Sequence, residues 1–336
     1  MSDSIGRSRL LSAELWRREP KKQTVVFLAE LGPLFVLIVA MIVATIAAPR
    51  FFSLLNLRNV ASQSAVFVVL AIGMTFVITG GGIDLSIGSQ VALIGVLMSS
   101  WIQSGNWPIG LAILGAILLG ALIGAFNGSL IAITGIPDFI ITLAGLELFR
   151  GLALLHSAGI IWDRFPRPFR GIAITRILGI PLPVIIALVF TAIAVFVYRS
   201  THYGRYTIAI GGNPRAAEVC GISRKRYKLY NYMMMGALCG VGAVLLVSRI
   251  DSAQATMGAQ YEIHVIAAVI MGGTSLFGGR GNIVGSLVGA LILAIIANVL
   301  VIIGVDFFWR LVATGIIIIL AVALNLWRER VLRENS

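Results

Sequence analysis

Charged residues are scarce in this sequence. Asp, Glu, Lys and Arg make up 12% of its 336 residues, whereas 58% of the residues are hydrophobic. Soluble domains carry roughly 25% charged residues, so the composition excludes an ordinary soluble domain. The mean hydropathy of +0.97 and apolar segments without alternation predict an all-α polytopic membrane protein and exclude a β-barrel.

Motifs for catalysis and metal binding are missing. The chain has no G-x-x-x-x-G-K-[ST] phosphate-binding loop, no H-E-x-x-H and no G-x-S-x-G, which excludes an ATPase with its own P-loop and gives no basis for a zinc protease or a hydrolase. Its three histidines and two cysteines lack the spacing of metal ligands. We therefore predict that the chain is not an enzyme and holds no metal or cofactor.

Acidic residues are fewer than basic ones, 14 against 26, which gives a net charge of +12. Such a charge can indicate nucleic-acid binding, but here Lys and Arg gather between apolar runs, in residues 1–30, 199–229 and 328–336. Membrane proteins keep basic segments in the cytoplasm. We therefore predict a membrane-lipid environment and no nucleic-acid partner.

Ten apolar segments can span a membrane. They cover residues 31–48, 61–79, 87–101, 109–133, 139–155, 181–198, 230–247, 263–276, 283–303 and 308–327. All three basic segments fall on the cytoplasmic side if six spans precede residues 199–229 and four follow. We expect one transmembrane domain over residues 31–327, with cytoplasmic tails at 1–30 and 328–336. The first thirty residues are too long and too charged for the n-region of a signal peptide.

One apolar run is interrupted by residues 80–89, Gly-Gly-Gly-Ile-Asp-Leu-Ser-Ile-Gly-Ser. Consecutive glycines predict a helix break or a very close backbone approach, because glycine adopts every φ region and has no side chain. Asp84 inside this break is either an ion site or a residue that caps the next helix. Because no other ion ligands accompany it, we interpret the break as a joint between helices.

Two further groups of charges have two interpretations each. Glu147 and Arg150 are three residues apart and can pair on one helix face, either as a structural pair or as a polar wall of a transport path. The predicted outer loop 157–180 contains Arg164, Arg167 and Arg170 with interleaved aromatic residues. This loop is either an interfacial belt with snorkelling arginines or a docking surface for a partner.

The segment 199–229 contains a predicted short helix. Asn213 can cap this helix, Pro214 suits its first position and Gly221 can end it. Such a helix, held off the membrane between basic flanks, is suited to docking into a groove on another protein. Elsewhere, Gly-xxx-Gly patterns in residues 120–128, 236–240 and 285–289 predict close contacts between spans.

Three segments together resemble the permease subunit of bacterial ABC importers for monosaccharides, the ribose/xylose/arabinose-type family. They are residues 81–88 at the break, 211–222 in the basic segment and 272–281 before the ninth span. The motif residues at the two helix breaks are Gly81, Gly82, Asp84, Ser86, Gly88, Gly272, Gly273, Gly278, Gly279 and Arg280. Glu147 and the basic outer loop are not part of the family's pattern.

The resemblance implies a type II ABC importer-like permease of about ten helices in the bacterial inner membrane, working as two copies or with a related permease. It also implies a periplasmic sugar-binding protein and a separate tandem-domain ATP-binding subunit, which binds ATP and Mg. The coupling residues toward that subunit would be Gly212, Asn213, Pro214, Arg215, Ala216, Ala217, Glu218, Gly221 and Ile222. Arg164, Arg167 and Arg170 become candidates for docking the binding protein.

We therefore expect the permease subunit of an ATP-driven importer for a monosaccharide or a related polyol. One alternative is a permease for branched-chain amino acids or nucleosides. Another, from a different class, is a secondary carrier that uses Asp84 as its ion site.

Overall fold

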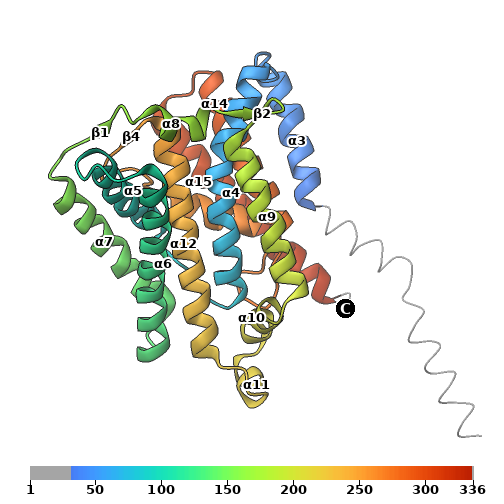
Figure 1. Ribbon diagram of the computed structural model, residues 1–336. Helices are drawn as coiled ribbons and strands as arrows, with labels where there is room; N and C mark the ends of the chain where they lie inside the picture. The colour runs from blue at the N-terminus through green and yellow to red at the C-terminus, as the bar shows by residue number, and fades with distance from the viewer. Residues whose placement is uncertain (1–31, 335–336) are drawn as a thin grey trace, which may run out of the picture.

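The computed structural model describes residues 32–334, so the predicted tail 1–30 lies outside the described residues. The chain there is a bundle of helices (Figure 1). The long and medium helices are α3 (Gly32–Ala47), α4 (Leu54–Thr79), α5 (Ile87–Gln103), α6 (Ile109–Thr134), α7 (Asp138–Ser157), α9 (Leu182–Ser200), α10 (His202–Gly212), α12 (Arg224–Ile250), α13 (Tyr261–Met271), α14 (Ile283–Ile302) and α15 (Phe307–Glu334). The short elements are β1 (Trp162–Asp163), α8 (Arg167–Ile174), β2 (Arg176–Ile177), β3 (Ile180–Pro181), α11 (Pro214–Val219) and β4 (Ser252–Ala253).

Each of the ten predicted spans coincides with a helix, which confirms the helical membrane fold. Six of these helices, α4, α6, α7, α9, α12 and α14, are long and apolar enough to cross a bilayer. The other four, α3, α5, α13 and α15, contain shorter apolar stretches. How many of the ten cross the membrane stays a prediction.

Several helix ends differ from the predicted ones. α4 starts at Leu54 rather than at residue 61, and α12 starts at Arg224 rather than at residue 230. In both cases the first turns contain polar or charged residues, and a serine caps the helix: Ser53 accepts from the backbone N–H of Asn56, and Ser223 from that of Arg226. Hydropathy marks only the apolar part of a helix, so it places such starts too late. α15 likewise continues past the predicted end, residue 327, to Glu334.

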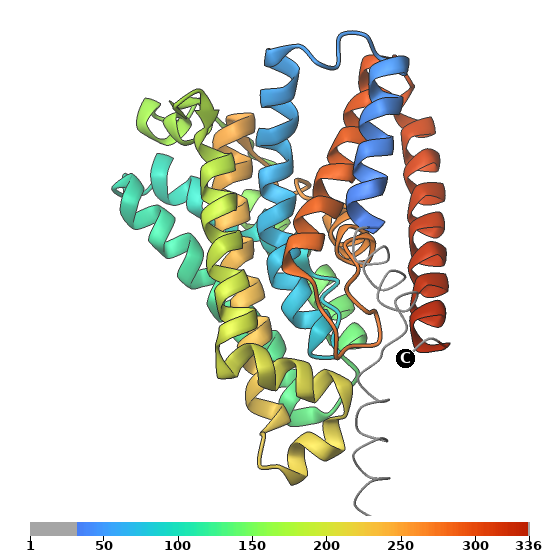
Figure 2. The same cartoon turned by 90° about the vertical axis from the view of Figure 1, so that its right-hand side faces the viewer.

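The core of the bundle is built by α4 and α12. About three-quarters of the apolar stretch of each is buried inside the chain, 78% for α4 and 72% for α12, against 22% to 28% for α6, α7 and α9. The outer helices therefore expose most of their apolar surface, which suits contact with lipid or another membrane protein. On one flank α3 packs against α14, with α15 beside them (Figure 2).

The glycine patterns in the spans serve close helix contacts, as the sequence predicts. A Cβ on Gly236 of α12 would lie 2.0 Å from the carbonyl oxygen of Gly120 on α6, and one on Gly124 would lie 2.0 Å from that of Tyr232. On α14, a Cβ on Gly289 would lie 2.0 Å from the carbonyl oxygen of Ala268. Only residues without a side chain permit such backbone contact.

The two segments predicted on opposite sides of the membrane lie at opposite ends of the bundle. α10 and α11 are at one end, and β1, α8, β2 and β4 are at the other (Figure 1). At the second end β1 pairs antiparallel with β4 and β2 with β3, each over two residues. We call these the coupling-loop end and the outer-loop end. α10 was not predicted, because its sequence carries turn-forming glycines and lacks a long apolar run.

Candidate functional site

The three glycine-containing motif segments meet at one place near the coupling-loop end. Gly81 follows α4, Gly211 lies in the last turn of α10 and Gly278 lies between α13 and α14, yet the three are in backbone contact. The backbone N–H of Gly279 donates to the carbonyl oxygen of Thr79 over 2.9 Å. We call residues 79–82, 211–212 and 278–279 the glycine junction.

The junction needs glycine for two reasons. A Cβ on Gly211 would lie 1.7 Å from the carbonyl oxygen of Thr79, which no atom pair tolerates. Gly278 and Gly279 have φ angles of +86° and +74°, a region that residues with a side chain rarely adopt. A Cβ on Gly278 would also lie 3.2 Å from the Cα of Gly81. The three segments are therefore packed backbone to backbone, so one cannot shift without displacing the others.

The other glycines of the motif segments are also close-contact positions. A Cβ on Gly82 would lie 2.4 Å from a carboxylate oxygen of Asp138, and one on Gly88 would lie 2.2 Å from the carbonyl oxygen of Gly258. Gly272 packs in the same way on the backbone of Gly285, and the next motif glycine, Gly273, has a φ of +88°. These two end α13 at Met271, five residues before the predicted end of the eighth span. The motif residue Arg280 is exposed.

Asp84 is fully buried inside the helix break. Its Oδ1 accepts from the backbone N–H and the hydroxyl of Ser86, at 2.8 and 2.6 Å, and its Oδ2 accepts from Gln90 Nε2 at 3.1 Å. Asn127 Nδ2, from α6, donates to Ser86 Oγ over 3.0 Å. The carboxylate therefore organises the start of α5, although Ser86 rather than Asp84 is the N-cap residue.

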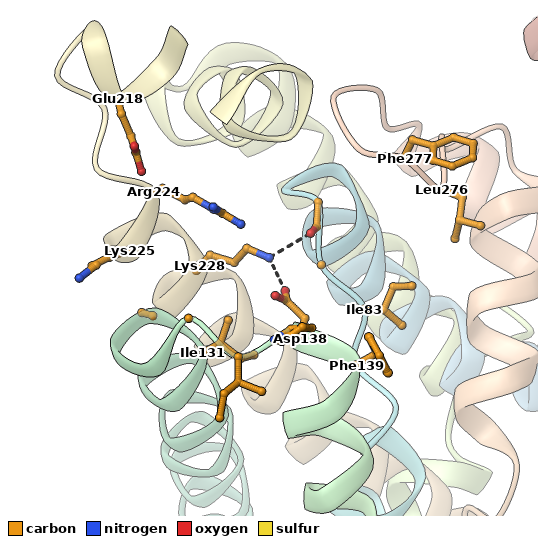
Figure 3. Close-up of a pocket in the computed structure, with 16 residues that line it drawn as sticks. Ile83, Ile131, Asp138, Phe139, Glu218, Arg224, Lys225, Lys228, Leu276 and Phe277 are labelled. Atoms are coloured by element: carbon orange, nitrogen blue, oxygen red, sulfur yellow. Dashed lines mark hydrogen bonds and ion pairs between the residues drawn. The ribbon is translucent and has the colours of Figure 1, made fainter. Parts of the chain in front are cut away.

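A second buried cluster joins the helix break to α7 and α12. Lys228 Nζ forms an ion pair with Asp138 Oδ2 and donates to the carbonyl oxygen of Gly81 over 3.0 Å (Figure 3). The Tyr232 hydroxyl lies 3.0 Å from the carbonyl oxygen of Ile83 and 2.8 Å from Asp138 Oδ2. We call Lys228, Asp138 and Tyr232 the Lys228 cluster.

The Lys228 cluster was not predicted from the sequence. Lys228 was one of several basic residues in the segment 199–229, and Asp138 stands at the start of an apolar run, where acids commonly favour a helix N-terminus. The two residues are 90 positions apart. Only the tertiary fold, which places the first residue of α7 beside the first turns of α12 and the helix break, brings them together, so no local sequence pattern predicts the pair.

An open cavity of about 540 Å³ lies beside this cluster, at the coupling-loop end. Its walls come from the helix break, the corner between α6 and α7, the start of α12 and the loop after α13. Figure 3 shows Arg224 and Lys228 from α12 near Glu218 from α11, with Leu276 and Phe277 on the far side. The cavity therefore lies between the helix break and α11, the segment predicted for coupling.

The predicted short helix is present as α11. Asn213 Oδ1 accepts from the backbone N–H of Ala216 at 3.1 Å, Pro214 is the first helical residue, and Gly221 follows the helix with a φ of +80°. Ala217 is buried, whereas Val219 is 89% exposed. Val219 was not among the residues predicted for coupling. Of those that were, Arg215, Ala216 and Glu218 are exposed, and Pro214 and Ile222 are partly buried. α11 thus presents a free surface at the coupling-loop end.

α10 anchors α11 to the bundle. The Tyr203 hydroxyl of α10 donates to Asn231 Oδ1 of α12 over 2.5 Å. Burial raises the pKa of Tyr203 above its ordinary value, so the hydroxyl keeps its proton and remains a donor at physiological pH. Since α10 also ends in the glycine junction, it forms a rigid link between α11 and the helix break.

The expected ion pair between Glu147 and Arg150 is not formed within the described structure. Arg150 Nη1 donates hydrogen bonds to the carbonyl oxygens of Ala255 and Met257, and its distance to the Met257 oxygen is 3.0 Å. Glu147 is exposed on α7. Helix spacing shows which residues share a face but gives no information about acceptors on another segment, so it does not predict these partners of Arg150. A role of Glu147 and Arg150 as a polar wall of the transport path stays a prediction. Arg150 instead ties α7 to the loop before α13.

The three outer arginines differ in their surroundings. Arg164 and Arg167 are exposed at the outer-loop end. Arg170 lies 3.6 Å from Asp251, the residue after α12, and Asp251 also accepts from the backbone N–H of Phe165 at 3.0 Å. The outer loop is thus fixed to the end of α12, with two of its three arginines free of that contact.

Within residues 32–334, no three His, Cys, Asp or Glu side chains lie close enough together to hold a metal ion. The glycine junction and the Lys228 cluster consist of tightly packed backbone and one buried ion pair, next to the exposed helix α11. Such packing suits the transfer of motion between α11 and the helix break.

Comparison with known proteins agrees with this picture. Residues 56–322 match the model of the family described as "Branched-chain amino acid transport system / permease component". The chain is similar to the ribose import permease protein RbsC of Bacillus subtilis (strain 168), 41% identical over 305 residues, covering 88% of this chain and 92% of that protein. It is 36% identical to RbsC of Haemophilus influenzae over 307 residues, covering 88% and 93%.

A third relative is the D-allose transport system permease protein AlsC of Escherichia coli (strain K12), which is 35% identical over 295 residues, covering 88% of this chain and 90% of that protein. No solved structure matches the chain.

Proposed function

The chain belongs to the permease-component family that includes the ribose import permeases, and on that premise we propose that it is the membrane subunit of an ATP-driven importer for a monosaccharide. It provides the path across the membrane, while a separate subunit hydrolyses ATP. Its relatives include ribose and allose permeases, which favours a monosaccharide over a branched-chain amino acid or a nucleoside.

One observation carries this proposal: the glycine junction connects the exposed helix α11 with the helix break after α4. α10 runs directly from the junction into α11, with Asn213 alone between the two helices. A displacement of α11 would therefore move Gly211 against Thr79 and Gly279. This arrangement suits a subunit that receives mechanical work at one end and changes the packing of its spans in response.

We further propose the partners of the complex. An ATP-binding subunit with two fused nucleotide-binding domains, which holds ATP and Mg, docks on α11 through Arg215, Glu218 and Val219. A periplasmic sugar-binding protein docks on the outer-loop end, where Arg164 and Arg167 are exposed. A second permease copy, or a related permease, completes the complex in the bacterial inner membrane, with both ends of the chain in the cytoplasm.

The rival secondary carrier receives less support. An ion-coupled carrier needs an acid that exchanges its proton or ion during transport. Asp84 instead accepts three hydrogen bonds from Ser86 and Gln90, all from the start of α5. That set of partners supports a structural role for the carboxylate.

The test is reconstitution of the chain with its co-encoded neighbours in proteoliposomes. We expect a tandem-domain ATPase to co-purify, and one sugar bound to the binding protein to raise both ATP hydrolysis and sugar uptake. Sugar uptake by this chain alone, driven by a proton gradient without ATP, would establish the secondary carrier. A complex that imports an amino acid or a nucleoside and no sugar would refute the proposed substrate class.

A further inference from the structure

We propose that Lys228, Asp138 and Tyr232 are positioning residues for transport, a latch that holds the helix break in place and opens when the start of α12 moves with α11. This inference rests on the proposed function and deepens it. These side chains connect the docking helix α11 to the helix break, in addition to the backbone contacts of the glycine junction.

The latch acts on backbone that secondary structure leaves without partners. Residues 80–86 between α4 and α5 are not helical, so their carbonyl oxygens need other donors where water is scarce. Lys228 Nζ supplies one to Gly81 and Tyr232 supplies one to Ile83. Thr142 Oγ1, from α7, lies 3.2 Å from the same Ile83 oxygen. The position of the break therefore depends on side chains from α7 and α12.

The Lys228–Asp138 ion pair makes the latch sensitive to small displacements. The side chain of Lys228 is 5% exposed and that of Asp138 is 14% exposed. A pair so shielded from water is stable only while its partners keep close geometry, because either charge left alone in such surroundings is strongly disfavoured. The joined arrangement is therefore favoured, and the pair separates only when movement of α12 brings the charges into the water of the open cavity that both residues line.

Lys228 is well placed to sense α11. Only residues 220–223 separate α11 from α12, which begins at Arg224. Lys228 therefore lies about one helical turn into α12. Glu218 of α11 and Arg224 line the same cavity as Lys228 and Asp138 (Figure 3). A pull on α11 that rotates or draws out the first turn of α12 would withdraw Lys228 from Asp138 and from Gly81 together.

The experiment measures coupling in the complete complex, reconstituted with its ATPase and its sugar-loaded binding protein. The variants are Lys228→Met and Tyr232→Phe, and the second removes only a hydroxyl. The matched controls on the same helix are Arg226→Met and Tyr230→Phe, whose side chains are exposed and outside the cavity wall. The readouts are the amount of assembled complex, basal ATP hydrolysis, and sugar molecules imported per ATP hydrolysed.

We expect the ratio of sugar to ATP to fall by about fivefold or more in Lys228→Met, a size typical of coupling between two sites. Tyr232→Phe should lower the same ratio by a smaller factor, and both controls should leave it unchanged. A role in folding alone would lower the amount of complex and leave the ratio of the remaining complex intact.

An unchanged ratio in assembled Lys228→Met and Tyr232→Phe complexes would overturn the latch. If Lys228→Met fails to assemble, Tyr232→Phe decides, because its volume is nearly that of the original residue. Failure of the proposed function is distinguishable: in that case the unmodified complex itself shows no sugar-stimulated hydrolysis.

Discussion

Gly279 donates its backbone N–H to the carbonyl oxygen of Thr79 over 2.9 Å. This bond joins the loop after α13 to the last residue of α4. Gly211, from α10, lies against both residues, since a Cβ there would be 1.7 Å from the Thr79 oxygen and 2.6 Å from the Gly279 nitrogen. α10, which leads into α11, thus contacts the core helix α4 through backbone atoms. A change of side-chain rotamer cannot relieve such a contact.

The first prediction concerns this contact. Gly211→Ala should lower the stability of the permease by about 1–3 kcal/mol or more, because the added methyl group must push two backbones apart. The measurement is thermal unfolding of the purified chain in detergent. Gly110→Ala is the matched control, because nothing lies within 4 Å of a Cβ there. Equal melting temperatures for the two variants would refute the tight packing.

The second prediction distinguishes the contribution of Arg150 to stability from that of Glu147. Arg150→Met should destabilise the chain by about 1–3 kcal/mol, because it leaves the carbonyl oxygens of Ala255 and Met257 without their donor. Glu147→Gln, at an exposed position that makes no ion pair with Arg150, should change stability by less than about 0.5 kcal/mol. Both effects are measured by thermal unfolding. Similar losses in the two variants would indicate that the pair forms after all.

The third prediction concerns Asp84. Asp84→Ala removes the acceptor of the Ser86 backbone N–H and of the Gln90 amide, which should cost about 1–3 kcal/mol and impair assembly or coupling. ATP-driven uptake should remain insensitive to the proton gradient in both the unmodified and the substituted complex. The check is uptake with and without a protonophore. A gradient dependence that disappears in Asp84→Ala would restore the ion-site hypothesis.

The fourth prediction concerns α11. Val219→Asp should weaken binding of the ATPase subunit by about tenfold, equivalent to about 1.4 kcal/mol, because it places a charge on an apolar contact. The permease fold should be unaffected, since Val219 is 89% exposed. Leu178→Asp is the control at the outer-loop end, where Leu178 is 97% exposed. The affinity for the ATPase is measured directly; a loss with Leu178→Asp and none with Val219→Asp would place the docking surface elsewhere.

The fifth prediction tests the outer-loop end. Charge reversal at Arg164 and Arg167 should weaken binding of the sugar-binding protein, with a larger effect at low salt because exposed charges are screened. Charge reversal at Arg170 should in addition lower stability, because its partner Asp251 also fixes the outer loop. The two readouts are binding affinity and melting temperature. Unchanged affinity in the Arg164 and Arg167 variants would leave this loop as an interfacial belt.

The sequence by itself determined the class of the protein. Hydropathy located the ten apolar helices but not α10, because burial in lipid requires apolar runs whatever the packing. Local rules also predicted α11, since a cap by Asn213 and a left-handed Gly221 depend only on neighbouring residues. The resemblance of three short glycine-containing segments was enough to indicate the permease family.

Only the tertiary structure decided what those segments do together. Gly81, Gly211 and Gly278 are far apart in the sequence, and their contact depends on how α4, α10 and the loop after α13 pack. The same holds for Lys228 and Asp138, whose pairing no local pattern encodes, and for Arg150, whose acceptors lie on another segment. Helix formation follows from interactions between near neighbours, whereas the partners of buried charges and of unpaired backbone are set by the whole fold.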